Sequence, residues 1–145
     1  IVSLARQLNL PFFLFGTGSK IMISDSGFDG LVIKNRTKNI QTVSVKGKVS
    51  KYSIGVEEAG VEVDSGVSIK RYMEYLDTQG LESIDFASIP GSIGGALFVS
   101  RFLQNRTKSI KVLDLRSEIE EISAKTLSLK RHIIISALFK IKAKR

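Results

Sequence analysis

Two glycine-rich turns carry the residue types and the spacing that are best suited to chemistry in this chain. The first is Phe15-Gly16-Thr17-Gly18-Ser19-Lys20, and the second runs from Ile89 to Ala96 as Ile-Pro-Gly-Ser-Ile-Gly-Gly-Ala. Glycine reaches positive φ and has no side chain, so a ligand can lie directly on the backbone. Successive backbone N–H groups in such a turn form a concave nest of donors that suits phosphate. Two such turns, each beside an apolar segment, predict a nucleotide cofactor that is held from both sides.

Other catalytic and metal-binding patterns are missing from the sequence. His132 is the only histidine and there is no cysteine, so a histidine-based triad, a thiolate nucleophile and a multi-histidine metal site are excluded. For His132 a structural role is therefore favoured over a catalytic one. The third glycine of a dinucleotide-fold fingerprint would stand at position 21, which is Ile21. The sequence thus predicts a cofactor site, but neither a catalytic residue nor a metal ligand.

The net charge of +8 is concentrated at one end of the chain. Residues 1–100 carry 10 Lys/Arg and 10 Asp/Glu, whereas residues 101–145 carry 12 Lys/Arg and 4 Asp/Glu, so the last third holds the whole excess. Two interpretations stay open: a solvated face or contact surface for another domain, and a surface for an anionic ligand or nucleic acid. Basic residues do not alternate with aromatic ones there, which argues against nucleic acid.

Chain length and hydropathy limit the number of domains and the possible cellular location. A chain of 145 residues fits one small domain or two subdomains. The longest apolar runs are too short to span a bilayer, so no membrane partner is expected. The first residues lack the order of a signal peptide, and the cytoplasm is the expected location.

Apolar periodicity predicts an alternation of helices and short strands. Residues 1–8 and 69–76 carry helical stripes, the second with Ser68 as a possible N-cap and Gly80 as a stop. A further helix is expected to begin at Ile93, with free N–H groups that face a phosphate. Strands are expected at 12–15, 31–34, 40–45, 53–56, 61–63, 110–115 and 133–139.

Both glycine turns match a known bacterial family. The segment from Pro11 to Gly30 resembles the flavin-binding loop of UDP-N-acetylenolpyruvoylglucosamine reductase, also called UDP-N-acetylmuramate dehydrogenase, with its Gly-x-Gly-Ser, apolar run, Asp, Gly-Phe and Gly. The segment Ile89–Ala96 is similar to that family's Ile-Pro-Gly-x-x-Gly-Gly-Ala. Between them, residues 59–82 have the family's strand, helix and Gly-Leu-Glu order. The resemblance is strong from Pro11 to Ala96.

The resemblance implies an α+β, two-lobed, PCMH-like domain that binds FAD. Lobe one would span about residues 1–45 and lobe two about 46–145, with the C-terminal substrate domain of the family absent. The first turn would wrap the pyrophosphate, and the second would meet the pyrophosphate and the flavin from the other side. The implied cofactor-binding residues are Gly16, Thr17, Gly18, Ser19, Lys20, Ile21, Ile89, Pro90, Gly91, Ser92, Gly94, Gly95 and Ala96.

The family's reaction and this chain's departures set further expectations. The family takes hydride from NADPH onto FAD and reduces the enolpyruvyl group of a UDP-sugar, a peptidoglycan precursor. Lys20 stands where the family has Asn, and Lys125 stands where it has an active-site Arg; lysine keeps the charge but loses the bidentate fork. The family's remaining catalytic groups lie in the substrate domain. This chain alone is therefore expected to bind FAD without completing the reaction, with NADPH and the UDP-sugar met together with a separate substrate domain.

Overall fold

The computed structural model describes residues 1–49, 51 and 54–144, and they form two sheets of different size. The small sheet pairs β1 (Phe12–Phe15) in parallel with β2 (Leu31–Lys34), and α1 (Val2–Gln7) precedes it. The large sheet is antiparallel throughout, in the order β3-β4-β7-β5-β6. Its strands are β3 (Ile40–Val49), β4 (Ile54–Asp64), β5 (Thr107–Leu113), β6 (Ile119–Ile122) and β7 (Ile133–Lys142). Mixed helix and sheet confirm the predicted α+β class.

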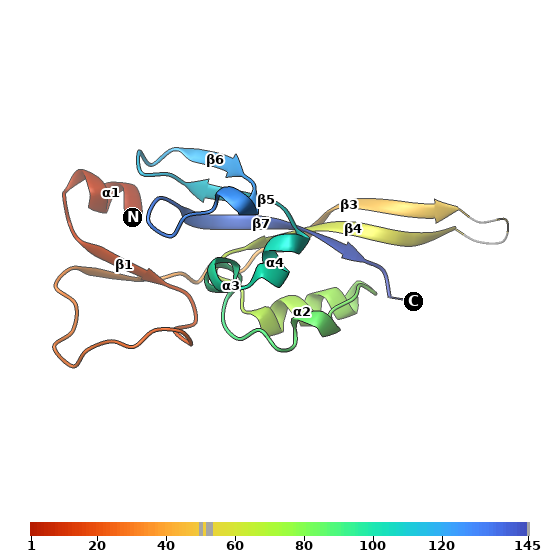
Figure 1. The fold of residues 1–145 in the computed structure, drawn as a ribbon, viewed down its shortest axis with the longest axis horizontal. Helices are drawn as coiled ribbons and strands as arrows, with labels where there is room; N and C mark the ends of the chain where they lie inside the picture. Colours follow the sequence, from red (N-terminus) through yellow and green to blue (C-terminus); the bar gives the residue numbers. More distant parts are fainter. Residues whose placement is uncertain (50, 52–53, 145) are drawn as a thin grey trace.

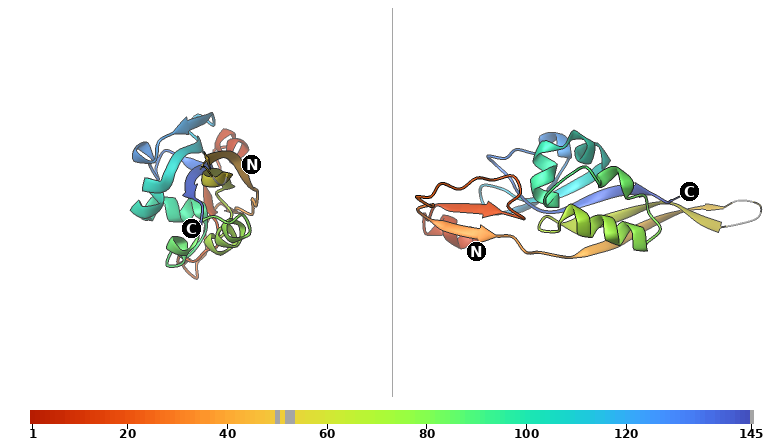
Figure 2. Two further views of the ribbon diagram at one scale, coloured as in Figure 1. Left: turned by 90° about the vertical axis from the view of Figure 1, so that its right-hand side faces the viewer. Right: turned by 90° about the horizontal axis from the view of Figure 1, so that it is seen from below.

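Three helices cover one face of the large sheet, as Figures 1 and 2 show. They are α2 (Ile69–Thr78), α3 (Ile93–Val99) and α4 (Arg101–Arg106); single turns of 3₁₀ helix lie at Ile84–Phe86 (η1) and Ala124–Thr126 (η2). The hairpin of β3 and β4 extends beyond the other strands at one end, and the small sheet lies at the opposite end (Figure 1). Within the described residues, no helix is long and apolar enough to cross a membrane.

The core lies between the large sheet and these helices. Its largest fully buried side chains include Tyr72, Phe86, Leu97, Leu103 and Phe139. Burying a side chain of this size contributes about 1.5–3 kcal/mol. The core therefore fixes the second glycine turn, which enters α3, against the sheet.

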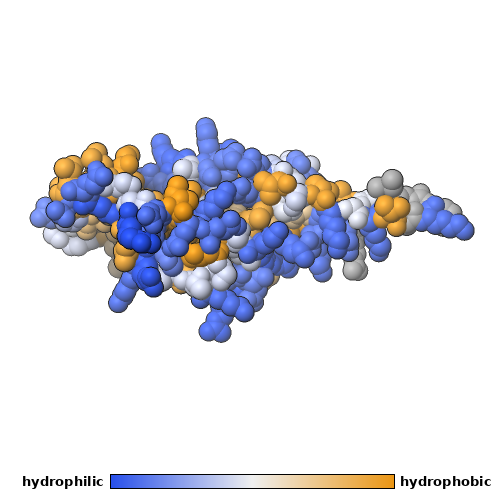
Figure 3. Space-filling view, turned by 90° about the horizontal axis from the view of Figure 1, so that it is seen from above, coloured by the Kyte–Doolittle hydropathy of each residue, from blue (hydrophilic) through white to orange (hydrophobic). Residues whose placement is uncertain are grey.

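The small sheet has little core of its own. Ala5 is its one buried residue among positions 1–34. Figure 3 shows apolar surface at the end of the molecule that carries α1 and β1, where Ile1, Leu4 and Leu8 are exposed. Residues 35–39 connect the two sheets. The expected lobe boundary near residue 45 falls within β3, and β3 belongs to the large sheet.

Some expected elements differ from the structure. The segments 53–56 and 61–63 were expected as two strands, which is wrong for the described residues: Ile54–Asp64 is one strand because β3 pairs with it from Ile54 to Val63 and β7 from Glu58 to Asp64. Ser53 lies outside the described residues. The helix α4 and the strand β6 were not predicted. The expected strands at 12–15, 31–34, 40–45 and 133–139 and the helices at 1–8 and 69–76 are confirmed within a few residues.

The hydroxyl of Tyr72 gives a first prediction. The ring packs edge-on against Phe86 and tilted against Phe139, with 5.4 Å between ring centroids in each pair. Its hydroxyl is buried and, among the described residues, has no hydrogen-bond partner, and burial raises the pKa of Tyr72 well above its usual range. Because an unpaired buried hydroxyl costs about 1–3 kcal/mol, Tyr72→Phe is expected to raise the free energy of unfolding by about 1 kcal/mol in urea titrations. A loss of stability would contradict this.

Candidate functional site

The two glycine turns face each other across one cavity. The cavity has a volume of about 470 Å³ and lies where the loop after β1, the loop before α3 and the start of β7 meet. Gly18 and Gly91 adopt φ values of +80° and +102°, which L side chains rarely tolerate. The glycines therefore shape both turns, and a volume of this size falls in the range of small-molecule and cofactor sites.

The turns also touch each other. A Cβ atom built on Gly16 would lie 2.2 Å from Ser92 Oγ, and one built on Gly91 would lie 2.8 Å from Ser19 Oγ. Both distances are shorter than real Cβ contacts, so the absence of a side chain is what lets the two backbones approach. This contact joins the small sheet to the large one at the cavity.

The first turn presents free backbone donors. Among the described residues, the N–H groups of residues 16–20 have no hydrogen-bond acceptor in the protein. Thr17 Oγ1 and Ser19 Oγ lie 3.2 Å apart in the same turn, and Lys20 adds a cation to the lining. A second cation lies close by, since Lys34 Nζ is 5.9 Å from the centre of the Phe15 ring. Five unpaired N–H groups with two cations suit a phosphate group.

The start of α3 does not present free donors, contrary to expectation. Ile93 N–H donates to Val67 O at 2.9 Å, Gly94 N–H donates to Ser65 O at 2.9 Å, and Gly95 N–H donates to Ser92 Oγ at 3.4 Å. The helix begins at Ile93 as predicted, but its first N–H groups are used to cap it and to bind it to the loop after β4. The second turn therefore offers hydroxyl groups and bare backbone surface, and the first turn offers the N–H groups.

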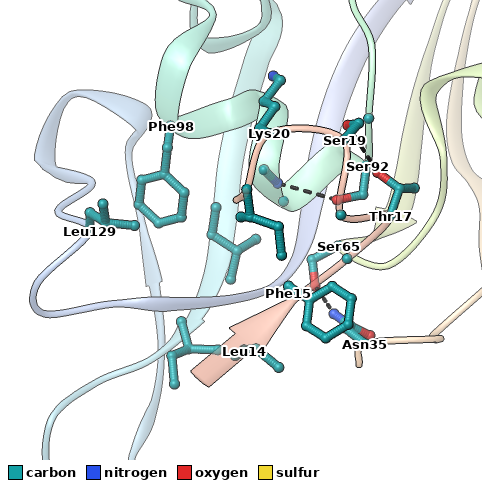
Figure 4. A pocket seen from close by; sticks show the side chains of 18 of the residues that line it. Leu14, Phe15, Thr17, Ser19, Lys20, Asn35, Ser65, Ser92, Phe98 and Leu129 are labelled. Atoms are coloured by element: carbon teal, nitrogen blue, oxygen red, sulfur yellow. Dashed lines mark hydrogen bonds between the residues drawn. The ribbon is translucent and has the colours of Figure 1, made fainter. Parts of the chain in front are cut away.

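Two buried serines line the cavity beside the turns. Ser65 Oγ accepts a hydrogen bond from Asn35 Nδ2 at 2.8 Å, and Ser92 Oγ accepts from Gly95 N–H (Figure 4). The amide of Asn35 is oriented by Thr37, whose N–H and Oγ–H both donate to Asn35 Oδ1. Both serines are at most 5% exposed, and each keeps its own hydroxyl proton for an acceptor in the cavity.

The cavity has a polar and an apolar end. Figure 4 shows Thr17, Ser19, Ser65 and Ser92 on one side, with Phe98 and Leu129 on the other. The apolar end is completed by Val99, His132, Ile133 and Ile134. Within the described part of the chain, no carboxylate lines the cavity. The arrangement suits an elongated ligand with an anionic portion at one end and an aromatic portion at the other.

Most of the expected cofactor-binding residues come together here, and three do not. The lining contains Gly16, Thr17, Gly18, Ser19, Lys20, Ile21, Gly91, Ser92, Gly94 and Gly95. Ile89 instead packs partly buried against the core, Pro90 is exposed outside the lining, and Ala96 is fully buried on the core-facing side of α3. These three residues position the second turn and do not face the cavity.

Sequence reasoning missed the lining residues that are far from the glycine turns in the chain. The fold brings Ser65 and Asn35 together at the cavity, where they form a hydrogen bond. The apolar end of the cavity includes Phe98, Leu129 and His132. His132 was expected to be structural. Its Nδ1 does accept a hydrogen bond from Ser128 N–H at 3.1 Å, but the side chain also lines the cavity.

Residues 1–101 match the family described as the FAD binding domain. Relatives with similar sequences are UDP-N-acetylenolpyruvoylglucosamine reductases from Clostridium tetani (29% identical, 97% of this chain, 47% of the relative) and Clostridium perfringens strain 13 (31%, 88% of this chain, 40% of the relative). The chain thus spans less than half the length of these curated relatives.

Solved structures show the same fold at low sequence identity. The reductase of the same name from Thermus caldophilus superposes with a TM-score of 0.66 at 18% identity, over 98% of this chain and 53% of that one. A VAO-type flavoprotein from Myceliophthora thermophila C1 superposes with a TM-score of 0.65 at 13% identity, over 96% of this chain and 28% of that one. The fold is therefore the two-lobed PCMH-like fold that the resemblance implied. Together with the match over residues 1–101, this places the chain in the FAD binding domain family.

Proposed function

We propose that this chain is the flavin-binding portion of a UDP-N-acetylenolpyruvoylglucosamine reductase, the enzyme type that makes a peptidoglycan precursor. The observation that carries the proposal is the pair of glycine turns that touch across the cavity, with the unpaired N–H groups of residues 16–20 at its polar end. The names of the relatives supply the reaction class. The comparisons give no support to a nucleic-acid-binding function.

The residues present fit FAD. The first turn would hold the pyrophosphate through backbone N–H groups, with Lys20 as a point charge, and the hydroxyls of Ser65 and Ser92 would donate to oxygen atoms beside it. Gly95 would let a flat ring lie on the first turn of α3, because among the described residues only Ser92 Oγ lies within 4 Å of a Cβ built there, at 3.5 Å. Bound FAD accepts a hydride and passes it on, and the protein supplies binding and alignment.

The electron donor and the substrate belong to the same proposal. NADPH as the donor and the enolpyruvyl UDP-sugar as the acceptor follow from the reductases that the chain resembles, and a cytoplasmic location follows because NADPH is a cytoplasmic reductant. The relatives are about twice as long as this chain, so we expect the groups that hold the sugar and donate the proton to lie on a substrate domain outside residues 1–145. This chain alone is expected to give no turnover with NADPH and the enolpyruvyl UDP-sugar.

The first measurement is the visible spectrum of the purified chain after incubation with FAD and desalting. Retained flavin bands at close to one FAD per chain are expected, because free donors and hydroxyls meet the phosphates on one side and apolar surface meets the ring on the other. Riboflavin, which lacks the pyrophosphate, serves as the comparison ligand and should be lost on desalting. A folded protein that emerges colourless would contradict the proposal.

A further inference from the structure

The small sheet is joined to the large sheet at both of its ends. Because β1 and β2 are parallel, both strands finish at the same end, and there the first glycine turn and the residues after β2 reach the large sheet. At the other end, α1 lies beside the turn between β5 and β6 (Figure 1). Arg6 in α1 makes the connection: its Nη1 donates to Asp114 O and, at 3.1 Å, to Ser117 Oγ.

Arg6 is the main polar link at this end of the small sheet. Within the part of the chain that the structure describes, its two hydrogen bonds are the only ones from residues 1–34 to residues beyond 39. A two-stranded sheet with so little core is marginally stable when it stands alone. The Arg6 guanidinium also lies 5.9 Å from the centre of the Phe12 ring, and Phe12 lines the cavity. One side chain thus contacts a cavity wall and fastens it to the large sheet.

The turn that receives Arg6 is braced by its own hydrogen bonds. Asp114 N–H donates to Glu118 O at 2.9 Å, and Ser117 N–H donates to Asp114 O at 3.1 Å. The N–H groups of Arg116 and Glu118 both donate to Asp114 Oδ1 at 2.8 Å. Asp114 O therefore accepts from Ser117 and from Arg6, which uses both of its lone pairs. The turn offers Arg6 acceptors that are already fixed in place.

We propose that Arg6 is a positioning residue for the cofactor, because it fixes the small sheet at the end away from the glycine turns and so holds the two walls of the cavity together. This rests on the proposed function. Residues 12–21 supply one wall, and α3 and the start of β7 supply the other. Without Arg6 the small sheet would be held at one end and free to pivot there. Only a fraction of the molecules would then have both walls in place, and the apparent affinity for FAD falls by that fraction.

The test measures FAD affinity by flavin fluorescence at a temperature at which every variant is folded. Arg6→Ala is expected to raise the dissociation constant about tenfold, which corresponds to about 1.4 kcal/mol, close to the contribution of one hydrogen bond to a charged group. Arg6→Lys keeps a charged donor and should recover part of the loss. The matched control, Arg71→Ala, removes an exposed guanidinium from α2, outside the cavity lining, and should change the dissociation constant less than about twofold.

Ser117→Gly separates positioning from stability. It removes one acceptor of Arg6, but glycine tolerates the φ of +64° at this position better than serine does, so the melting temperature should not fall. The dissociation constant for FAD should still rise about threefold. In Arg6→Ala/Ser117→Gly the second substitution should add nothing, because the partner of Ser117 is already gone.

Hydrogen exchange of the flavin-free protein tests the link itself. In Arg6→Ala the amide protons of β1 and β2 should exchange faster than in the wild type, whereas those of β4 and β7 should not change. Equal exchange of β1 and β2 in the two proteins, unchanged FAD affinity in Arg6→Ala, or additive losses in the double variant would overturn this inference and leave the proposed function standing. Failure of the wild type to bind FAD would instead overturn the proposed function, and this role of Arg6 with it.

Discussion

Replacing Gly95 with leucine is expected to weaken FAD binding about 100-fold and to leave the fold intact. Gly95 is exposed in the first turn of α3 and lines the cavity, and within the described part of the chain a Cβ atom built there would meet only Ser92 Oγ, at an ordinary 3.5 Å. The protein thus gains no packing from glycine at this position, although glycine in a helix costs about 0.8–1.0 kcal/mol relative to alanine. A ligand that lies directly on the backbone would explain why glycine stands at position 95. A leucine side chain would occupy the place of the flavin ring.

The expected loss is large. Overpacking costs about 1–3 kcal/mol at a site that can yield, and each 1.4 kcal/mol is tenfold, so we expect the dissociation constant for FAD to rise about 100-fold. Flavin fluorescence titration measures it, and thermal melting of the flavin-free protein should show no loss of stability. Gly95→Ala should raise the melting temperature slightly.

The adjacent residue, Gly94, provides the matched control for the Gly95 substitutions. A Cβ atom on Gly94 would lie 3.0 Å from Ser65 Cβ and 3.2 Å from Ser65 O, so an added methyl group would crowd Ser65 inside the protein. Gly94→Ala should therefore lower the melting temperature, in contrast to Gly95→Ala. If Gly95→Leu bound FAD as tightly as the wild type, the ring would not lie on α3 and the assignment of the second turn would be wrong.

Local signals predicted those elements whose stability is also local. The helix α2 was placed correctly because Ser68 Oγ accepts from Arg71 N–H at 3.2 Å and Gly80 adopts a φ of +68°, so its limits are encoded by adjacent residues. The prediction divided strand β4 at residues 57–60, where Glu57, Glu58 and Gly60 separate its two apolar stretches. Its continuity comes from pairing with β3 and β7.

The candidate site divides in the same way. Glycine turns can be recognised in a sequence because their residues encode a backbone shape. Ten of the thirteen expected residues line the cavity. Ser65 and His132 gave no comparable signal. Ser65 is placed by strand pairing, because its N–H donates to Ile135 O at 2.9 Å and so brings the end of β4 to the start of β7. His132 directly precedes β7. A resemblance to a family can identify the motifs of a site. Site residues that are brought to the cavity by strand pairing can be identified only once the fold is known.

The contact between the two turns leads to the second large effect. Gly16→Ala is expected to destabilise the protein by about 1–3 kcal/mol and to weaken FAD binding at least tenfold. The added methyl group would lie 2.2 Å from Ser92 Oγ and 2.8 Å from Ser92 Cβ, and Ser92 is 5% exposed, so the serine cannot move aside freely. Urea unfolding measures the stability, and flavin fluorescence measures the affinity. Gly55→Ala, where the added carbon would meet no heavy atom of the described residues within 4 Å, should leave both quantities nearly unchanged.

A double-mutant cycle shows whether the Gly16–Ser92 contact itself is responsible. Ser92→Gly removes both atoms that the Gly16 methyl group would strike, and the loss of an N-cap serine to glycine costs only a few tenths of a kcal/mol. The double variant Gly16→Ala/Ser92→Gly should therefore be more stable than Gly16→Ala alone, with a coupling energy above about 1 kcal/mol. Additive losses would mean that the added methyl group does not act through Ser92. If the double variant regained stability but not FAD affinity, the two turns would approach as in the wild type while the Ser92 hydroxyl was missing. That result would place the Ser92 hydroxyl among the groups that contact the cofactor.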